Sequence, residues 1–245
     1  MFPAPVEVIL AGRLDYEAGL RLQAECMERR RSGQRTDTLI LLEHEPVITL
    51  GRNARREHIL MPEAELQRRG IEVRECNRGG DVTWHGPGQL VGYPIFDLRG
   101  WPRGLAALDH PRRSFPGLGP VDYVRGLELA LMAALAEAGL ATQRIAGLTG
   151  VWTMTRPARK IAAIGVHVSR GITSHGFALN LAPDLAQFQA IIPCGLSGHE
   201  VTSLARETGT VLTVREAAGL VARHIGRIFE REVEWRTEPA AISAT

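Results

Sequence analysis

Short apolar segments of strand length alternate with helical segments along this chain, and that alternation constrains the fold more than any other feature. Helices are predicted at residues 15–31 and 62–69, from Pro120 to just before Gly139, and from Thr213 to about Phe229. Strands are predicted between them, at residues 5–10, 38–42, 47–50, 71–74, 90–96, 151–154, 160–168 and 173–181. Because the segments do not alternate in strict strand–helix–strand units, we predict an α+β fold with a mixed, largely antiparallel sheet flanked by helices.

The composition agrees with one globular domain over residues 1–245. Hydrophobic residues make up 44% of the chain and charged residues 23%, which is enough apolar material for one large core. The segment from Arg99 to Gly119 is rich in glycine, proline and arginine, and is predicted to be an exposed loop rather than a domain boundary.

The balance of charge excludes several classes of partner. Lysine and arginine together number 29 against 27 acidic residues, so the chain lacks the strong basic field that nucleic acids and anionic membranes select. Arg29, Arg30 and Arg31 do form a run, followed by Arg35. This run is either a solvated helix end, where the helix dipole favours cations, or a patch that meets an acidic protein partner.

The lack of a recognisable targeting signal and the pattern of cysteines both favour the cytoplasm. No apolar run approaches the ~20 residues of a membrane-spanning helix, and the first ten residues lack the pattern of a signal peptide. Cys26, Cys76 and Cys194 are an odd number without a CxxC pair, which argues against a disulfide framework. We therefore expect a cytoplasmic protein in a reducing compartment.

The segment from Arg78 to Pro94, RGGDVTWHGPGQLVGYP, carries the densest chemical pattern. Its glycines allow the backbone to approach a ligand closely or to turn where a Cβ atom would clash. Tight hairpins are also glycine-rich, but a hairpin does not explain Thr83, His85 and Gln89 beside the glycines. The segment matches neither the phosphate loop GxxxxGK[ST] nor GxGxxG, and His85 could also be a hydrogen-bonded core histidine.

Two further segments hold reactive side chains. Lys160 opens the otherwise apolar strand KIAAIGVHV, where an ordinary solvated edge charge is the alternative interpretation. Cys194 lies between Pro193 and Gly195, in a predicted turn after an apolar run. A side chain in such a turn can be presented to a ligand rather than buried.

Taken together, these segments resemble the lipoyl(octanoyl) transferases. The string RGGxxTxHxPGQxVxYP is filled at every position from Arg78 to Pro94, and KIAxxG, HGFALN, PCG and TSL follow in order at residues 160–165, 175–180, 193–195 and 202–204. The resemblance covers roughly residues 38–214 and implies the fold shared with lipoate and biotin ligases. The connection over residues 99–119 departs from the family, since it is longer than the family usually carries.

The resemblance also implies which residues carry the reaction. Cys194 would be the nucleophile that takes an octanoyl group from octanoyl-acyl carrier protein as a thioester, and Lys160 its catalytic partner. The acceptor would be a lysine of the apo lipoyl domains of 2-oxoacid dehydrogenases or of the glycine cleavage H protein. The implied substrate-binding residues are Arg78, Gly79, Gly80, Asp81, Val82, Thr83, Trp84, His85, Ala163, Ile164, Gly165, Gly176, Phe177 and Ala178.

These roles are physically reasonable. A free thiol has a pKa of about 8.5, so only about 3% is thiolate at pH 7. A cation about 4 Å away, at an effective dielectric constant near 20, contributes up to about 4 kcal/mol, or about three pKa units. Burying an octanoyl chain at ~0.8 kcal/mol per methylene contributes about 5 kcal/mol to binding.

The sequence offers no metal motif, because the histidines show neither HExxH nor HxxxH spacing and there is no cysteine cluster. We therefore predict no metal and no cofactor beyond the donor thioester. One alternative is an ATP-dependent lipoate or biotin ligase of the same fold, which would need no nucleophilic cysteine. Another is a non-catalytic protein that binds acyl carrier protein, against which the presence of both Lys160 and Cys194 argues.

Overall fold

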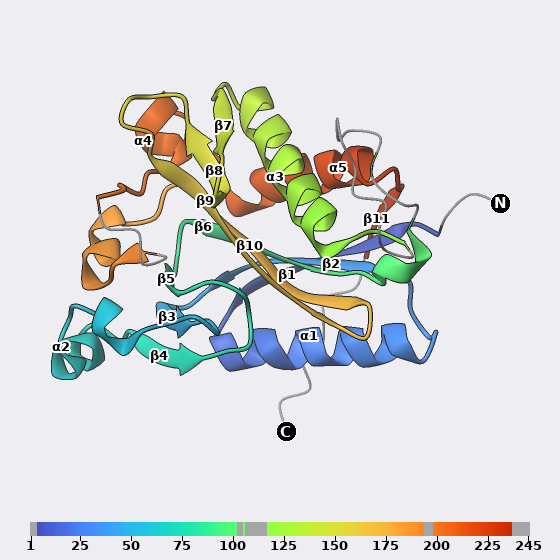
Figure 1. Cartoon of the computed structure of the whole chain (residues 1–245), viewed down its shortest axis with the longest axis horizontal. Coiled ribbons are helices and arrows are strands. Elements are labelled where there is room, and N and C mark those ends of the chain that lie inside the picture. The colour runs from blue at the N-terminus through green and yellow to red at the C-terminus, as the bar shows by residue number, and fades with distance from the viewer. Residues whose placement is uncertain (1–3, 102–104, 106–116, 194–197, 237–245) are drawn as a thin grey trace.

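An eight-stranded sheet with helices on both faces forms the body of the protein (Figure 1). The structure is a computed structural model and describes residues 4–101, 105, 117–193 and 198–236. In spatial order, the strands of the sheet are β11 (Val233–Trp235), β1 (Val6–Leu14), β2 (Thr38–His44), β6 (Gln89–Ile95), β10 (Ile172–Asn180), β9 (Lys160–Ser169), β8 (Leu148–Thr153) and β7 (Thr142–Ile145).

The strand directions confirm the predicted mixed, largely antiparallel sheet. β1 is parallel to both β11 and β2, whereas every other neighbouring pair in this sheet is antiparallel. At the centre, β10 pairs with β6 on one side and with β9 on the other, so that Phe177 lies between Gly92 and Ile164. The HGFALN and KIAxxG motifs are therefore neighbours in the middle of the sheet.

A second, three-stranded sheet lies beside one end of the first (Figure 1). It consists of β4 (Glu72–Glu75), β3 (Val47–Leu50) and β5 (Val82–His85) in that order. Pro46 separates β2 from β3, and at this proline the chain passes from the large sheet into the small one. The glycine-rich segment is therefore not wholly a loop, because β5 lies inside it and pairs antiparallel with β3.

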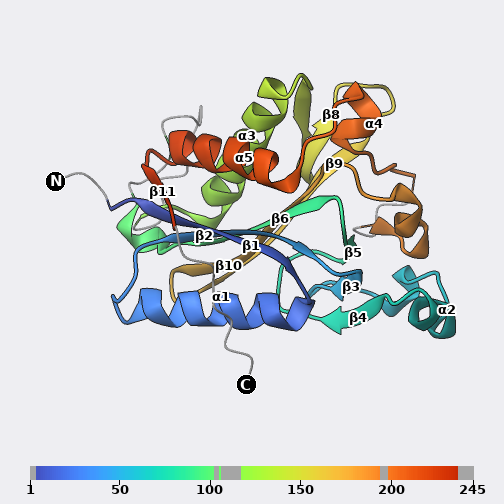
Figure 2. The same cartoon turned by 180° about the vertical axis from the view of Figure 1, so that it is seen from behind.

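Helices cover the two faces of the large sheet unequally (Figures 1 and 2). α1 (Tyr16–Arg31) lies on one face, and α3 (Pro120–Glu137) and α5 (Val214–Ile228) lie together on the other. Asp15 caps α1 by accepting from the Ala18 N–H, and Thr213 and Glu216 form the predicted capping box of α5. The shorter helices are α2 (Glu63–Arg68), α4 (Leu204–Thr208) and the 3₁₀ helices η1 (Arg56–His58), η2 (Leu98–Gly100) and η3 (Leu185–Ala190).

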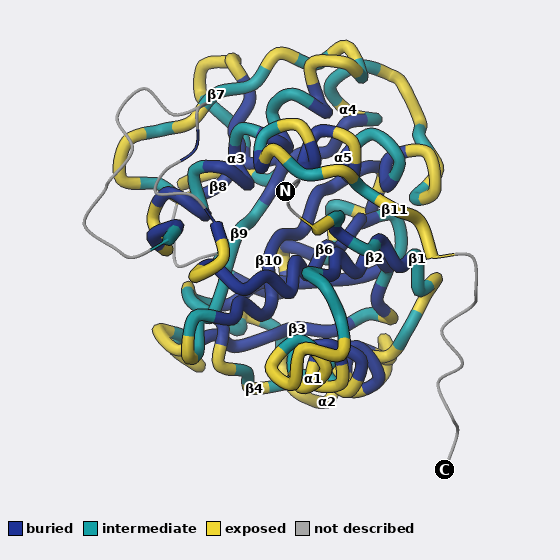
Figure 3. The backbone as a smooth tube through the Cα atoms, turned by 90° about the vertical axis from the view of Figure 1, so that its right-hand side faces the viewer, coloured by how far each residue is buried: buried dark blue, intermediate teal, exposed yellow. Residues whose placement is uncertain are grey.

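The hydrophobic core has three parts, and the strands between them are buried along most of their length (Figure 3). The largest part fills the space between the sheet and the α3–α5 pair, with Phe96, Tyr123 and Phe229 in edge contact. A smaller part lies under α1, and a third lies under the small sheet, where Trp84 contacts Phe188. In the described part of the chain, no helix combines the length and hydropathy needed to cross a membrane.

Candidate active site

A cavity of about 480 Å³, counted out to its open mouth, lies between the glycine-rich segment and the central strands β9 and β10. All of the predicted substrate-binding residues line it except Val82 and Trp84. Those two side chains point from β5 into the core under the small sheet, because successive side chains of a strand face opposite sides. Thr83 and His85 consequently face the cavity.

A second, smaller cavity adjoins the first and contains Lys160. The two cavities share Thr83, Ala163 and Ala178, and the second is also lined by Lys160 and Pro193. Pro193 directly precedes Cys194, which lies outside the described residues. The shared residues place the two cavities side by side, with Thr83, Ala163 and Ala178 between Lys160 and the larger cavity.

Two predicted glycines allow backbones to approach one another beside this space. A Cβ atom on Gly165 would lie 2.6 Å from the Gly79 carbonyl oxygen, and one on Gly176 would lie 2.2 Å from the Gly92 carbonyl oxygen. Real Cβ atoms do not come that close, so any side chain at either position would force strands or loop apart. The scaffold around the cavity therefore requires both glycines.

Asp81 connects the rim of the first cavity to the segment before Cys194. Its carboxylate accepts hydrogen bonds from the His58 Nδ1–H, at 2.7 Å, and from the Val82 backbone N–H. The His58 carbonyl in turn accepts from the Ile192 N–H at 2.8 Å. The rim and the chain that leads to Cys194 are thus held together through η1.

Arg78 begins a hydrogen-bond chain whose direction is fixed. Its guanidinium can only donate, and it donates to the Thr49 carbonyl at 2.7 Å and to the Thr49 hydroxyl at 2.9 Å. The hydroxyl proton of Thr49 is then directed at His85 Nε2, 3.4 Å away. His85 donates through Nδ1 to the Gln89 side-chain oxygen at 2.7 Å, so a neutral imidazole satisfies both contacts.

The chain continues from Gln89 to the main chain beside Lys160. The Gln89 amide donates to Asn180 Oδ1 at 2.9 Å, and the Asn180 amide donates to the Thr202 carbonyl at 2.9 Å. The Thr202 N–H donates to the Lys160 carbonyl at 2.9 Å. Residues of four of the quoted motifs, the segment from Arg78 to Pro94, HGFALN, TSL and KIAxxG, are therefore joined in one network that fixes the first residue of β9.

Three further polar side chains line the first cavity. Tyr16, Tyr93 and His175 lie there, and none of the three was among the predicted site residues. The Leu14 carbonyl faces His44 Nδ1, so that nitrogen carries the proton and His44 Nε2 accepts from the Tyr93 hydroxyl at 2.7 Å. His175 has a left-handed backbone, with φ 55°, and its N–H donates to the Gln23 side chain.

Burial keeps the three histidines of this cluster neutral. It lowers the pKa of His85 to about 3, with an added contribution from neighbouring His44. Burial likewise lowers the pKa of His44 to about 4 and that of His175 to about 4, where the Arg78 charge acts in the same direction. These depressed pKa values agree with the hydrogen bonds, in which His44 and His85 each use one ring nitrogen as an acceptor.

Lowering the pH from about 7.5 to about 5 should destabilise the fold through these imidazoles. Below the ordinary histidine pKa of 6.5, the unfolded chain binds protons that a buried imidazole with a pKa of about 4 does not. The free energy of unfolding therefore falls as the pH falls, by roughly 2 kcal/mol per such imidazole at pH 5. Thermal melts across this range would measure the effect.

His44→Gln tests this linkage, since glutamine can donate to the Leu14 carbonyl and accept from Tyr93 but does not titrate. The fall in melting temperature between the two pH values should shrink by roughly 5 °C in this variant. His199→Gln, a change at an exposed histidine, is the matched control. An unchanged pH dependence in His44→Gln would contradict the assignment.

Lys160 is the only lysine in the sequence. The other 28 of the 29 lysine and arginine residues are arginines. Its side chain is 8% exposed at the start of β9, and its Nζ lies 5.2 Å from the centroid of the Trp152 ring. An edge charge on a strand would be solvated, and any arginine would serve as well there. Burial beside a cavity, in a chain that otherwise uses arginine, indicates that this position requires a lysine.

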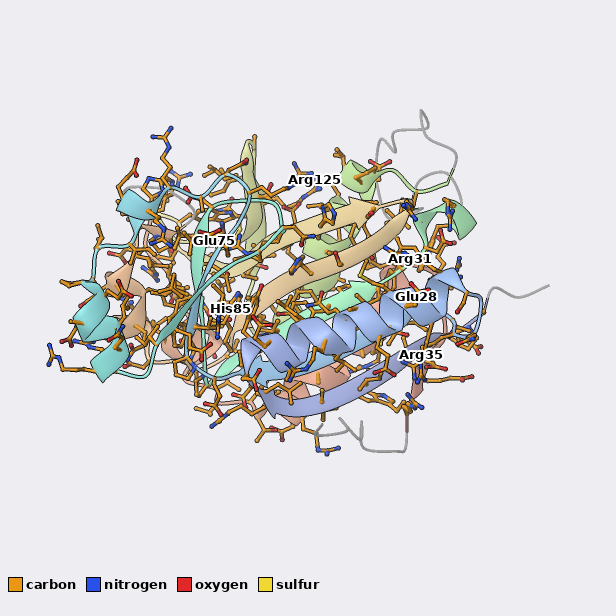
Figure 4. The ribbon with its side chains drawn as sticks, turned by 90° about the horizontal axis from the view of Figure 1, so that it is seen from below. Glu28, Arg31, Arg35, Glu75, His85 and Arg125 are labelled. Atoms are coloured by element: carbon orange, nitrogen blue, oxygen red, sulfur yellow. The ribbon has the colours of Figure 1, made fainter. Side chains whose placement is uncertain are left out.

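The arginine run is far from this site. Figure 4 shows Glu28, Arg31 and Arg35 at the C-terminal end of α1, while His85 lies near the other end of the helix. All four arginines pair with acidic side chains of the same chain: Arg29 with Glu25, Arg30 with Asp37, Arg31 with Glu28, and Arg35 with Glu7. These pairs favour the helix-end interpretation of the run.

Across the described ranges, no three histidine, cysteine or acidic side chains gather as a metal-binding group.

The chain is similar to known proteins in its sequence and in its fold. The chain matches the model of the lipoyl protein ligase A/B catalytic domain over residues 15–226. It is 51% identical to an octanoyltransferase of Acidobacterium capsulatum over 233 residues, covering 93% of this chain and 92% of the relative. It is 48% identical to an octanoyltransferase of Koribacter versatilis over 230 residues, covering 94% and 86% of the two chains.

Among solved structures, the fold is similar to that of lipoate-protein ligase A bound with ATP. The TM-score is 0.71 at 13% sequence identity, with 97% of this chain and 90% of that chain covered. This likeness extends the predicted lipoate-ligase fold to the whole of the described chain.

Proposed function

This chain belongs to the family of the lipoyl protein ligase A/B catalytic domain, as an acyltransferase that moves octanoyl groups in lipoate biosynthesis, and we propose that Cys194 carries the group as a thioester. The proposed donor is octanoyl-acyl carrier protein. The proposed acceptor is a lysine of an apo lipoyl domain, of the 2-oxoacid dehydrogenases or of the glycine cleavage H protein.

One observation carries this proposal above the others. Lys160 and Pro193, the residue before Cys194, line the same cavity, and that cavity adjoins the larger one between β9 and β10. A cation, a nucleophile and an apolar slot are the three components that a thioester acyltransferase requires. A non-catalytic protein would not need the first two.

The slot has dimensions that suit a medium-length acyl chain. Ala178, which lines both cavities, and His175, which lines the larger one, are three residue steps apart on β10, or about 10 Å along a strand. An extended octanoyl chain measures about 9 Å, given single carbon–carbon bonds of about 1.5 Å in a zigzag. The walls of Val91, Ile164 and Phe177 would bury its methylenes.

The proposed reaction has two balanced steps. In the first, the Cys194 thiolate attacks the donor's thioester carbonyl, a new carbon–sulfur bond forms, and the carrier's thiol leaves with one proton. In the second, the neutral amine of the acceptor lysine attacks the octanoyl thioester, an amide forms, and the Cys194 sulfur leaves while the amine loses a proton. Lys160 would stabilise the thiolate, which is the attacking group in the first step and the leaving group in the second.

Incubation with octanoyl-acyl carrier protein, without ATP and without acceptor, tests the proposal directly. Intact-mass spectrometry should show the enzyme heavier by one octanoyl group, and peptide mapping should place that group on Cys194. Neutral hydroxylamine should remove it, because hydroxylamine cleaves thioesters and leaves amides intact.

The other outcomes favour other functions. An adduct on Lys160, resistant to hydroxylamine, would replace the cysteine by the lysine as the acyl carrier. Transfer that requires ATP and free octanoate would favour a ligase, and no adduct with no transfer would leave a binding protein.

A further inference from the structure

Lys160 and Trp152 face each other across two antiparallel strands. Trp152 of β8 is the register partner of Lys160 of β9. The Lys160 Nζ lies 5.2 Å from the centroid of the Trp152 ring, and the ring is fully buried. An ammonium within about 6 Å of an aromatic face is attracted to it, and tryptophan is the strongest partner of this kind.

Gly150 closes the other side of the lysine slot. Its φ of 123° is a conformation that side chains rarely adopt, and a Cβ atom there would lie 2.7 Å from the Lys160 Cε and 2.5 Å from the Ala162 carbonyl oxygen. The stem of Lys160 therefore lies directly against the backbone of β8. A residue other than glycine would push the stem away.

Glu128 fixes the backbone of Gly150 from the opposite layer. It lies on α3 with 0% exposure, and its Oε1 accepts from the Gly150 N–H at 2.9 Å. Its other oxygen accepts from the Arg125 guanidinium, which balances the buried charge. A buried carboxylate is costly, so the hydrogen bond of one of its oxygens to the Gly150 N–H, with the charge balanced by Arg125, indicates that the position of this strand matters.

Other ionisable groups lie around the slot. The His199 ring makes an edge contact with Trp152, with centroids 5.4 Å apart. On the far side, Arg159 pairs with Glu207 at 2.8 Å, next to the Lys160 backbone. The ionisable side chains nearest to the parts of this slot are therefore His199, Arg159, Glu207 and Glu128.

We propose that Trp152 is a positioning residue for the acyl transfer: its ring holds the Lys160 ammonium at the cavity that Pro193 lines, while Gly150 and Glu128 hold the stem beneath it. This inference rests on the proposed function of Lys160 beside Cys194. It adds three residues to the site that none of the quoted motifs contains, from β8 and α3.

The single lysine makes the test unusually direct. Protein grown with ε-¹³C-lysine gives one signal, that of Lys160, and the ring current of Trp152 should shift its ε protons upfield. Trp152→Leu should return the signal to the position of free lysine, and Trp152→Phe should keep part of the shift. In the same variants kcat should fall on the order of tenfold for leucine and less for phenylalanine, with little change in the donor KM.

Two further variants separate positioning from folding. Gly150→Ala keeps Trp152 but obstructs the stem, so it should also move the Lys160 signal and lower kcat. Trp235→Leu, at a tryptophan that is 45% exposed on β11, is the matched control and should change neither. Melting temperatures identify any variant that fails for lack of stability.

The proposal is overturned if the wild-type Lys160 signal has the position of free lysine, or if Trp152→Leu shifts the signal without lowering kcat. The resonance is measured in the resting enzyme and does not depend on acyl transfer. A shifted resonance in an enzyme that forms no Cys194 adduct would therefore contradict the proposed function while leaving the lysine–tryptophan contact intact.

Discussion

Replacing Cys194 by serine should lower octanoyl transfer on the order of 10⁴-fold or more and abolish the covalent adduct. A serine hydroxyl is almost wholly protonated at neutral pH and is a poor nucleophile unless a dedicated base takes its proton. The two histidines that line the large cavity offer no such base. Burial depresses the pKa of both His85 and His175, His85 Nδ1 is bonded to Gln89, and His175 Nε2 is bonded to the side-chain oxygen of Asn77. The measurement is initial transfer rate with octanoyl-acyl carrier protein and an apo lipoyl domain.

The other two cysteines provide the controls. Cys26 is completely buried under α1, where its sulfur accepts from Arg35, and burial raises the pKa of its thiol. The Cys76 thiol donates to the Leu50 carbonyl at 3.4 Å, a contact that a serine hydroxyl can replace. Cys26→Ser and Cys76→Ser should therefore retain transfer. Loss of activity in either one, with Cys194→Ser still active, would overturn the assignment of the nucleophile.

The general fold was predictable because its elements carry strong local signals. The capping box at Thr213 and Glu216, the glycine after α3, and the branched apolar runs of β2, β9 and β10 each depend on residues within a few positions of one another. β5 was missed for the opposite reason. Its four residues, Val82 to His85, lie among glycines, and only pairing with the distant β3 makes them a strand.

The glycine at 176 illustrates how far sequence reasoning could reach. The resemblance implied that it binds substrate, through its place in the HGFALN motif. The structure shows a packing reason for this glycine, because a Cβ atom would meet the Gly92 carbonyl oxygen and the Pro94 ring of the adjacent strand. This close approach depends on the register of β10 with β6, which no local pattern contains.

The polar side chains that line the first cavity could not be predicted from the sequence, for a similar reason. Tyr93 and His175 lie within the quoted motifs, but nothing in the motifs says that they meet Tyr16, more than seventy residues away from either. Tyr16 follows the cap of α1 and looks like an ordinary buried aromatic.

The special role of Lys160, by contrast, could have been inferred from the sequence, since a lone lysine among 28 arginines is a property of the sequence itself.

Replacing Lys160 by alanine should slow acylation of Cys194 by roughly 20- to 30-fold at pH 7 without changing which residue is acylated. If the ammonium stabilises the thiolate by two pKa units, its removal raises the pKa of the Cys194 thiol by that amount and lowers the thiolate fraction at neutral pH correspondingly. Lys160→Arg keeps the charge, but the lysine stem lies between Gly150 and the Trp152 ring with little room to spare. A Cβ atom on Gly150 would lie only 2.7 Å from the Lys160 Cε. The broader, planar guanidinium should therefore rescue the reaction only in part.

The pH dependence of Cys194 alkylation by iodoacetamide separates this role from a structural one. Cys26 is buried, so replacing Cys76 by serine leaves Cys194 as the principal reactive thiol in every protein compared. The midpoint of alkylation should lie lowest in the Lys160 enzyme, higher in Lys160→Arg and highest in Lys160→Ala, in the same order as the transfer rates. A fold defect would reduce the rates and the melting temperature but would not order the midpoints in this way. If Lys160→Ala loses transfer while the alkylation midpoint stays where it was, the ammonium does not act on the thiol, and Lys160 must act on the acyl group or the acceptor amine instead.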